Sequence, residues 1–535
     1  MFHRADAPRG DSLLPADKPG KGSEATTRNG FDLAIGNPPY IRIQTLTKSD
    51  PELAAYYKQR YQSAAKGNYD LYVCFVERGL ELLHQNGQLA FIQPHKFFNN
   101  QYGEPLRGFL SRNRNLRHIV HFGTQQIFPG ATNYVCLLFL AKAGVESCRF
   151  VRVDNLALWL QILTATEEII PASSLTSAEW NFAGEVGGPL LTKLKSAGVR
   201  LLDLPAEMSR GSSTGDDEVF VLESGSGIVE PELLRIPVFA TDFSKFNFIP
   251  NSKWKVIFPY HETPNGLELM PEQELKKEFP RGYRYLMSKK PELLKRKGAR
   301  FWFGFTAPRN LDLHDKAQIL VPLLAEKGSF AIVPRSLHGK LCPMASGGFT
   351  IMLHDSSPVS ADYVLGLLNS PILFWILLRT SNSFRGGWIT CTKQYFGELP
   401  IRVLNRHDQK EQSAHDAIVR LVELLSWLHA QPSVAKSTRE HPIDPDIAAY
   451  IEQWVNALVY ELYFPVEICA AGLQFFELTE SLKLPSLDSL PPAAADRLER
   501  FRKMHKEWSG QGHRLRIALD KLRTLDLVRT IEGQA

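Results

Sequence analysis

Short apolar runs alternate with segments of helical periodicity between residues 31 and 155. Leu71, Val76 and Leu80 recur on one side of a helix expected over residues 69–84, and Asn86-Gly87 would end it. The runs between such helices are too short and too apolar for surface helices, and they are typical of strands in a sheet covered on both faces. The expected strands are residues 31–35, 89–92, 116–122 and 134–140, with a further helix at 105–112.

The pattern changes along the rest of the chain. Residues 1–30 have no apolar periodicity and are predicted to be a disordered leader, whereas residues 156–200 read as a helical connection. Residues 201–404 contain short aromatic strands, many Gly and Pro, and interspersed cations, as expected of a mixed α and β domain. Residues 405–535 carry apolar residues at helical spacing. The predicted fold class is therefore α/β over residues 31–155, followed by an α+β domain and C-terminal helices.

Length, charge and cysteine content exclude few classes of protein. A chain of 535 residues is too long for one core, so two to four domains are expected. The formal net charge of +5 permits a nucleic-acid partner, but only a clustered patch would argue for one. None of the six cysteines has CxxC spacing, so neither a zinc site nor a disulfide framework is indicated. The apolar stretch 363–378 is interrupted by Asn369, Ser370 and Pro371, which favours core elements over a membrane span, and we expect a cytoplasmic protein.

The most specific motif is Asn37-Pro38-Pro39-Tyr40, directly after the first apolar run, which we expect to be a buried strand. Two prolines fix φ and remove two backbone donors, so the loop is stiff. It would hold an amide, with acceptor and donor atoms, in a fixed relation to an aromatic ring on which a flat base can stack. Such a loop suits the exocyclic amine of a base. The plainer interpretation is a Pro-Pro turn at the end of a strand.

Several segments in the same order resemble the N6-adenine DNA methyltransferases of restriction–modification systems. The similarity is to the branch with an Asn-Pro-Pro-Tyr loop and a TaqI-like C-terminal specificity domain. It is carried by the loop itself and by residues 68–72 (NYDLY), 87–97 (GQLAFIQPHKF), 128–134 (FPGATNY), 210–220 and 459–463. This resemblance implies that residues 31–155 form part of a Rossmann-like methyltransferase sheet.

The resemblance also implies roles for individual residues. The methyl donor would be S-adenosylmethionine, and the substrate would be an adenine flipped out of duplex DNA. Asn37 and the carbonyl of Pro38 would accept the two N6 protons, and Tyr40 and Phe128 would stack on the base, with Tyr134 as the alternative to Phe128. Members of the family act in restriction–modification or related defence systems. The chain shows no convincing nuclease motif, so cleavage is not predicted.

The chain departs from the family pattern at its start. The family places a cofactor-binding half, with a Gly-rich turn, before the Asn-Pro-Pro-Tyr loop. Only about thirty residues precede residue 31 here, and no Gly-rich strand–turn–helix follows later. The sequence therefore resembles the C-terminal portion of a methyltransferase, as a split subunit, a truncated product or a fragment would. Its cofactor-binding residues are unknown, and that half would come from a partner subunit or from a missing N-terminal portion.

Residues 201–404 are the expected DNA target-recognition domain. Arginine reads guanine in the major groove and lysine mainly neutralises phosphate, so cations interleaved with aromatics favour a DNA face. The alternative is that the aromatics form a core with a solvated rim of charges. The candidate DNA-binding residues are Lys295, Arg296, Lys297, Arg300, Arg309, Arg385, Trp388 and Lys393.

Two other functions stay open. An Asn-Pro-Pro-Tyr loop also occurs in enzymes that methylate the side-chain amide of protein glutamine, but those are small and lack a long aromatic and basic second domain. A non-catalytic DNA-binding specificity subunit, which needs a partner for cofactor binding, is the stronger alternative, because the cofactor-binding half is not found in this sequence.

Overall fold

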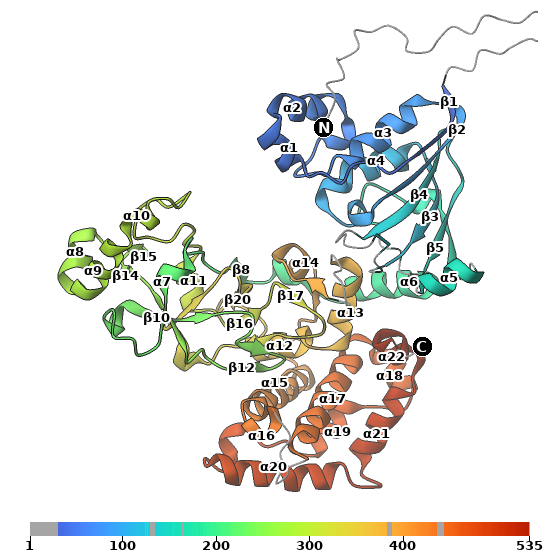
Figure 1. Ribbon diagram of the computed structural model, residues 1–535. Coiled ribbons are helices and arrows are strands. Elements are labelled where there is room, and N and C mark those ends of the chain that lie inside the picture. Colours follow the sequence, from blue (N-terminus) through green and yellow to red (C-terminus); the bar gives the residue numbers. More distant parts are fainter. Residues whose placement is uncertain are drawn as a thin grey trace, which may run out of the picture. The chain divides into compact units, whose positions relative to one another are not determined.

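The computed structural model describes residues 30–123, 125, 127–128, 134–153, 155–162, 165–180, 182, 184–381, 388–435 and 443–533. The chain divides into two compact units, Met1–Trp180 and Asn181–Ala535 (Figure 1). The expected disordered leader, residues 1–30, lies almost wholly outside the described residues. The boundary between the two units, after Trp180, falls inside the predicted connection at 156–200 and not at either of its ends.

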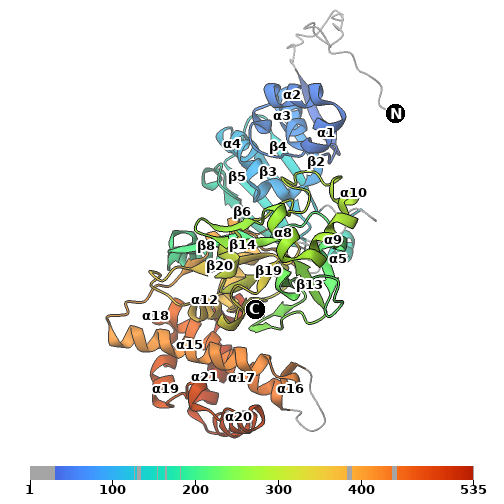
Figure 2. The ribbon, with the colours of Figure 1, turned by 90° about the vertical axis from the view of Figure 1, so that its left-hand side faces the viewer.

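Unit 1 is a six-stranded mixed sheet in the order β1-β2-β4-β3-β5-β6. Pairing is parallel between β1 and β2 and between β3 and β5, and antiparallel elsewhere. Helices α3 and α4 lie against the sheet in both ribbon views (Figures 1 and 2). The strands are β1 (Phe31–Gly36), β2 (Leu83–Pro94), β3 (Leu116–His121), β4 (Val135–Ala141), β5 (Ser147–Arg152) and β6 (Thr166–Pro171), and the helices are α1 (Ile43–Ser49), α2 (Pro51–Arg60), α3 (Tyr72–Leu82), α4 (Glu104–Arg112) and α5 (Leu156–Ile162).

Strand β1 is not buried, contrary to the prediction from its apolar sequence. Phe31, Leu33 and Ile35 are 50%, 53% and 75% exposed. The reason is its position at the end of the sheet: β1 pairs with β2 only, and among the described residues no strand pairs with its other edge. An apolar edge strand of this kind presents unpaired backbone groups and uncovered side chains.

Two further predictions in unit 1 need correction. The helix expected over residues 69–84 ends at Leu82, and β2 begins at once at Leu83, so Asn86-Gly87 lies within a strand instead of breaking a helix. The segment 156–200 is not wholly helical, because β6 pairs antiparallel with β5 and extends the sheet. The helix at 105–112 is confirmed by α4.

Unit 2 combines two four-stranded sheets with many helices. The sheet orders are β19-β10-β13-β9 and β18-β16-β20-β8. The strands of the first sheet are β9 (Val221–Glu223), β10 (Leu234–Val238), β13 (Trp254–Ile257) and β19 (Leu341–Pro343); those of the second are β8 (Ala206–Arg210), β16 (Ile319–Val321), β18 (Ala331–Ile332) and β20 (Phe349–Leu353). Helices α8 (Glu272–Glu278), α9 (Pro280–Ser288) and α10 (Lys290–Leu293) follow the hairpin of β14 (Tyr260–Thr263) and β15 (Gly266–Leu269).

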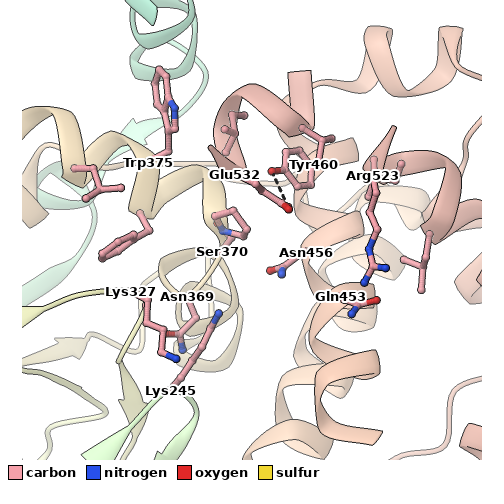
Figure 3. A pocket seen from close by; sticks show the side chains of 18 of the residues that line it. Lys245, Lys327, Asn369, Ser370, Trp375, Gln453, Asn456, Tyr460, Arg523 and Glu532 are labelled. Atoms are coloured by element: carbon pink, nitrogen blue, oxygen red, sulfur yellow. Dashed lines mark hydrogen bonds between the residues drawn. The ribbon is translucent and has the colours of Figure 1, made fainter. Parts of the chain in front are cut away.

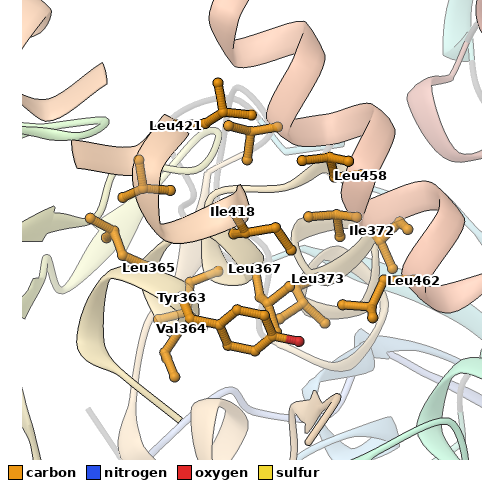
Figure 4. Close-up of a cluster of buried hydrophobic side chains, with 14 of the residues drawn as sticks. Tyr363, Val364, Leu365, Leu367, Ile372, Leu373, Ile418, Leu421, Leu458 and Leu462 are labelled. Atoms are coloured by element: carbon orange, nitrogen blue, oxygen red, sulfur yellow. The ribbon is translucent and has the colours of Figure 1, made fainter. Parts of the chain in front are cut away.

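The C-terminal part of unit 2 is helical in the described residues, as its periodicity predicts. Its core also takes in α12 and α13, so the segments 201–404 and 405–535 share one continuous cluster of buried side chains (Figure 4). The largest of these include Trp375, Trp454 and Tyr363. The main helices are α12 (Ala361–Leu368), α13 (Pro371–Thr380), α15 (Gln409–His429), α17 (Asp444–Tyr463), α19 (Phe475–Ser481), α20 (Ala494–Trp508), α21 (Arg514–Arg523) and α22 (Asp526–Glu532).

The break between α12 and α13 has a clear cause. The Asn369 amide donates to and accepts from the backbone of Phe330, at 2.9 and 3.1 Å. Ser370 caps α13, and Pro371 occupies its first turn, where a missing donor costs nothing. Within the described residues no single helix is long and apolar enough to cross a membrane; α12 and α13 together pass that test but are bent by 64°.

One ion pair ties the helical layer together. Asp444, at the start of α17, is completely buried, and Arg502 of α20 donates to its two carboxylate oxygens at 2.9 and 2.8 Å. A charge-assisted, bidentate pair of this kind is strong only while both members are present. Removing one leaves an uncompensated buried charge.

We therefore expect Asp444→Ala to lower the free energy of unfolding by about 3–5 kcal/mol. The matched control is Asp526→Ala, whose side chain is almost fully exposed and lies 3.8 Å from Arg529, and which should change stability by less than about 1 kcal/mol. Urea denaturation followed by tryptophan fluorescence measures both. Equal effects of the two substitutions would show that the Arg502 pair does not stabilise this layer.

Candidate active site

Polar residues gather at one edge of the sheet in unit 1. Strands β1, β2, β3 and β5 run in the same direction, because β3 and β2 both pair antiparallel with β4. Their carboxyl ends therefore meet at a single edge, which is where open α/β sheets bind ligands. The Asn-Pro-Pro-Tyr loop, the segment from Gln93 to Lys96 and His121 all lie there, beside the start of β4.

The loop is fixed to this edge by its last residue. The Tyr40 hydroxyl donates to the carbonyl of Ile92 on β2 at 3.0 Å. Burial raises the pKa of Tyr40 to about 12, so its hydroxyl stays protonated at neutral pH. Pro38 is buried, whereas Asn37 is exposed and has its amide open to a ligand. The predicted catalytic residues thus occupy a rigid loop with one accessible amide.

The two candidate stacking residues lie on the same apolar cluster. Tyr40 and Phe128 are both partly buried against the group formed by Val120, Phe122 and Val135 with neighbouring valines. Tyr134, the alternative to Phe128, is buried, and its carbonyl accepts from the backbone N–H of His95 at 3.3 Å. Phe128 thus shares an apolar cluster with Tyr40, and the stacking role of Phe128 or Tyr134 stays a prediction.

A small charged group flanks the loop. Residues 41–43 and 69–71 form a short antiparallel pairing, with Ile43 N–H donating to the carbonyl of Tyr69 and Leu71 N–H to that of Ile41. This places Asp70 opposite Arg42, two residues after Tyr40. Burial raises the pKa of Asp70, and the nearby cations Lys96 and Arg42 act in the opposite direction. The site therefore holds a partly buried carboxylate with two cations nearby.

Two histidines form a hydrogen-bond chain with a fixed direction. The backbone N–H of Gly123 donates to His121 Nδ1 at 3.1 Å, so Nε2 of the neutral ring carries the proton. That N–H donates to His95 Nδ1 at 3.1 Å, which leaves His95 with its proton on Nε2. Burial lowers the pKa of His95 to about 4 and that of His121 well below its ordinary value. Neither ring serves as a base at Nε2.

Sequence reasoning did not single out Asp70, Gln93 or His121 as site residues. Gln93 is completely buried on β2, and neither atom of its amide has a hydrogen-bond partner. Leaving a buried amide unpaired costs about 1–3 kcal/mol, so it marks a place that calls for explanation. Their positions in the sequence could have identified them, because each of these polar residues lies at the end of a strand or just before a helix, at the same edge of the sheet as the loop.

The candidate DNA-binding residues of unit 2 differ in what they contact. Arg296 donates to the carbonyls of Leu293, Thr214 and Trp302, and its guanidinium lies over the Phe220 ring. Arg309 donates to the carbonyl of Gly211 at 2.9 Å. Both arginines are therefore engaged inside the protein, and a DNA role for them stays a prediction.

The remaining candidates lie at the surface or outside the described residues. Lys295, Lys297, Arg300 and Lys393 are exposed, and Trp388 is 41% exposed. Arg385 lies outside the described residues. Lys393 opens α14 (Lys393–Gly397), away in sequence from the other cations. The structure thus brings Lys295, Lys297 and Arg300 together on one segment and does not place Arg385.

A separate pocket of about 650 Å³ lies within unit 2. Lys245, Lys327 and Asn369 point into it from one side, and Gln453, Asn456 and Tyr460 of α17 face them (Figure 3). Two of its charges are already paired, since Lys245 bonds Glu452, and Tyr460 donates to Glu532 at 3.2 Å. Nothing in its lining points to one ligand class. No group of three or more metal-ligating side chains occurs among the described residues.

A family model for the Eco57I restriction-modification methylase matches residues 11–128. The Type II restriction enzyme and methyltransferase RM.Eco57I of Escherichia coli is 26% identical over 444 residues, covering 76% of this chain and 43% of that protein. The Type II methyltransferase M.BstVI of Geobacillus stearothermophilus is 23% identical over 439 residues, 75% of this chain and 73% of its own length. The chain thus spans less than half of the first relative.

Among solved structures, the Type IIL restriction-modification enzyme MmeI in complex with DNA has a TM-score of 0.51. It is 13% identical and covers 84% of this chain and 57% of that one, which shows a similar fold. Together these comparisons support a relationship to the methyltransferases of restriction–modification systems.

The histidine chain has a consequence for the pH dependence of stability. The folded pKa of His95, about 4, lies below the unfolded value of about 6.5, so the unfolded state takes up protons first as pH falls. The contribution of His95 to the free energy of unfolding should be constant above about pH 7. It should fall between about pH 6.5 and 4, with a slope approaching about 1.4 kcal/mol per pH unit. His95→Gln should reduce that slope in urea denaturation. An unchanged slope would mean that His95 is protonated in the folded protein.

Proposed function

We propose that this chain is the catalytic-loop and target-recognition portion of a site-specific DNA methyltransferase that modifies adenine at N6. The observation that carries the proposal is the Asn37–Tyr40 loop at the carboxyl edge of the sheet, held by the bond from Tyr40 to β2. The relatives named as Type II methyltransferases support the same reaction class.

The chemistry follows from the acceptors that the loop offers. Adenine N6 is a poor nucleophile because its lone pair is delocalised into the ring. The Asn37 Oδ1 and the Pro38 carbonyl would each accept one N6 proton and localise that lone pair. These bonds strengthen as positive charge develops on N6, so they stabilise the transition state more than the ground state. The N6 proton then leaves after the methyl group has been transferred.

The apolar cluster beside the loop suits a flat base. Tyr40 and Phe128 would stack on the flipped adenine, each stack worth roughly 1–3 kcal/mol. Because the Tyr40 hydroxyl is anchored on Ile92, its ring would not have to be ordered when the base arrives. DNA binding would belong to residues 201–404.

The methyl donor of this reaction would be S-adenosylmethionine, which supplies an electrophilic methyl group. The described residues fit only part of such a site: they offer Asn37, Asp70 and the unpaired Gln93 amide, but no Gly-rich strand–turn–helix. The open edge of β1 is where additional strands would continue the sheet, and its exposed Phe31, Leu33 and Ile35 would then be covered. We therefore place the cofactor-binding half along β1, supplied by a partner subunit or by an N-terminal portion of the same protein.

The same open edge favours a second candidate function. A chain that lacks the cofactor half would act alone as a DNA-binding specificity subunit, with no methylation of its own. The two cases differ in whether addition of the missing half yields methylation.

We expect Asn37→Ala, in the protein complemented with its cofactor-binding half, to lower the methylation rate by about 10²–10³-fold while DNA binding persists, because one transition-state acceptor is lost. Transfer of labelled methyl groups to duplex DNA measures the rate. Asn86→Ala, an exposed amide within β2, is the matched control and should have no effect. Near-normal methylation by Asn37→Ala would refute the assignment.

The isolated chain should bind S-adenosylmethionine weakly or not at all by calorimetry. Complementation should create a binding site, and Leu33→Lys, which puts a charge on the exposed face of β1, should weaken complementation. Micromolar binding by the isolated chain would show that its own residues form the cofactor site.

A further inference from the structure

A concentration of positive charge lies on α8, α9 and α10 and the segment after them. Residues 272–300 contain ten lysines and arginines against four glutamates, a net charge of +6 where the whole chain has +5. These helices lie together at one end of unit 2, apart from the C-terminal helices (Figures 1 and 2). A segment with this density of positive charge is typical of a surface that binds a polyanion.

Within this patch, residues 294–301, which we call the tip loop, combine exposed cations with exposed apolar side chains. Leu294 and Phe301 are 64% and 50% exposed. Lys295, Lys297 and Arg300 are exposed on the same eight residues, and these three cations form no ion pair with the described residues. The Arg300 guanidinium lies 5.7 Å from the centre of the Phe301 ring. Large side chains held in water beside cations indicate a surface that meets a partner.

The ends of the tip loop are rigid. Leu293 and Phe303, which border it, are both buried in one apolar cluster. Arg296 locks the loop closed, since it donates to Leu293 at one end and to Trp302 at the other. Gly298 makes the turn, with φ at +89°. The loop therefore presents Phe301 and its cations without the entropy cost of ordering a free segment.

We propose that the tip loop inserts Phe301 as an apolar wedge between adjacent base pairs of duplex DNA, while Lys295, Lys297 and Arg300 contact the flanking phosphates. The inference rests on the proposed function, since it takes DNA as the substrate. Wedges of Phe or Leu flanked by cations partly unstack a base step and bend the duplex. An acidic protein partner would satisfy the cations equally well, but it would not need a rigid aromatic ring between them.

The test separates the wedge from the phosphate contacts. Binding of the full chain to a 40-base-pair mixed-sequence duplex, labelled at both ends for energy transfer, gives affinity and bending across a salt series. Phe301→Ala should weaken binding at least about fivefold and abolish the bend, but leave the slope of log affinity against log salt unchanged. The double variant Lys295→Ala, Lys297→Ala should flatten that slope by about two units and keep the bend at saturating protein.

The control is Val466→Ala, since Val466 is a 76% exposed apolar residue on α18 (Pro465–Ala470), and it should behave as wild type. Thermal melting checks that each variant is folded. If wild-type protein bends DNA and Phe301→Ala bends it equally, the wedge is refuted and DNA binding stands. If wild-type protein does not bind the duplex and binds only a polyglutamate probe, the DNA function itself fails.

Discussion

The shared direction of β1, β2 and β3 is the constraint on which the candidate site depends. Because β4 runs against both β2 and β3, it joins them without reversing their common polarity. Three separate stretches of sequence therefore end at one edge, and each delivers a polar residue there: Asn37, the Gln93–Lys96 segment and His121. The site has no dedicated element of its own. It depends on where the strand ends fall, so a change of register in β2 by one residue would turn Gln93 to the other face of the sheet.

Unit 2 shows how two arginines of similar sequence context can serve different purposes. Arg296 uses its donors on three backbone carbonyls and closes a loop. Arg300, four residues later, has its guanidinium beside an exposed ring. Composition counts both as positive charge, but only the second is available to a partner. Counting the cations in a sequence therefore gives more positive side chains than are exposed with donors free to bind a partner.

The elements of unit 1 were largely predictable, because apolar periodicity reports how each segment packs. The existence of β1, α4 and β3 follows from the sequence alone. The exposure of β1 could not be predicted, because apolar content indicates that a strand is suited to burial but does not indicate whether a covering element is present. The end of α3 was misplaced because Leu82 and Leu83 fit both a helix and a strand. In the site, the loop motif identified Asn37 and Tyr40, whereas Asp70 and His121 depend on pairings between distant segments that no local pattern encodes.

The open edge of β1 also bears on how the protein is handled by the cell and in the laboratory. A short edge strand with alternating apolar side chains is a template for addition of another strand, including the same strand of a second molecule. If β1 is left uncovered, self-association through this strand would compete with binding of the covering segment, and it would increase with protein concentration. Residues 31–36 would then be the place where aggregation nucleates.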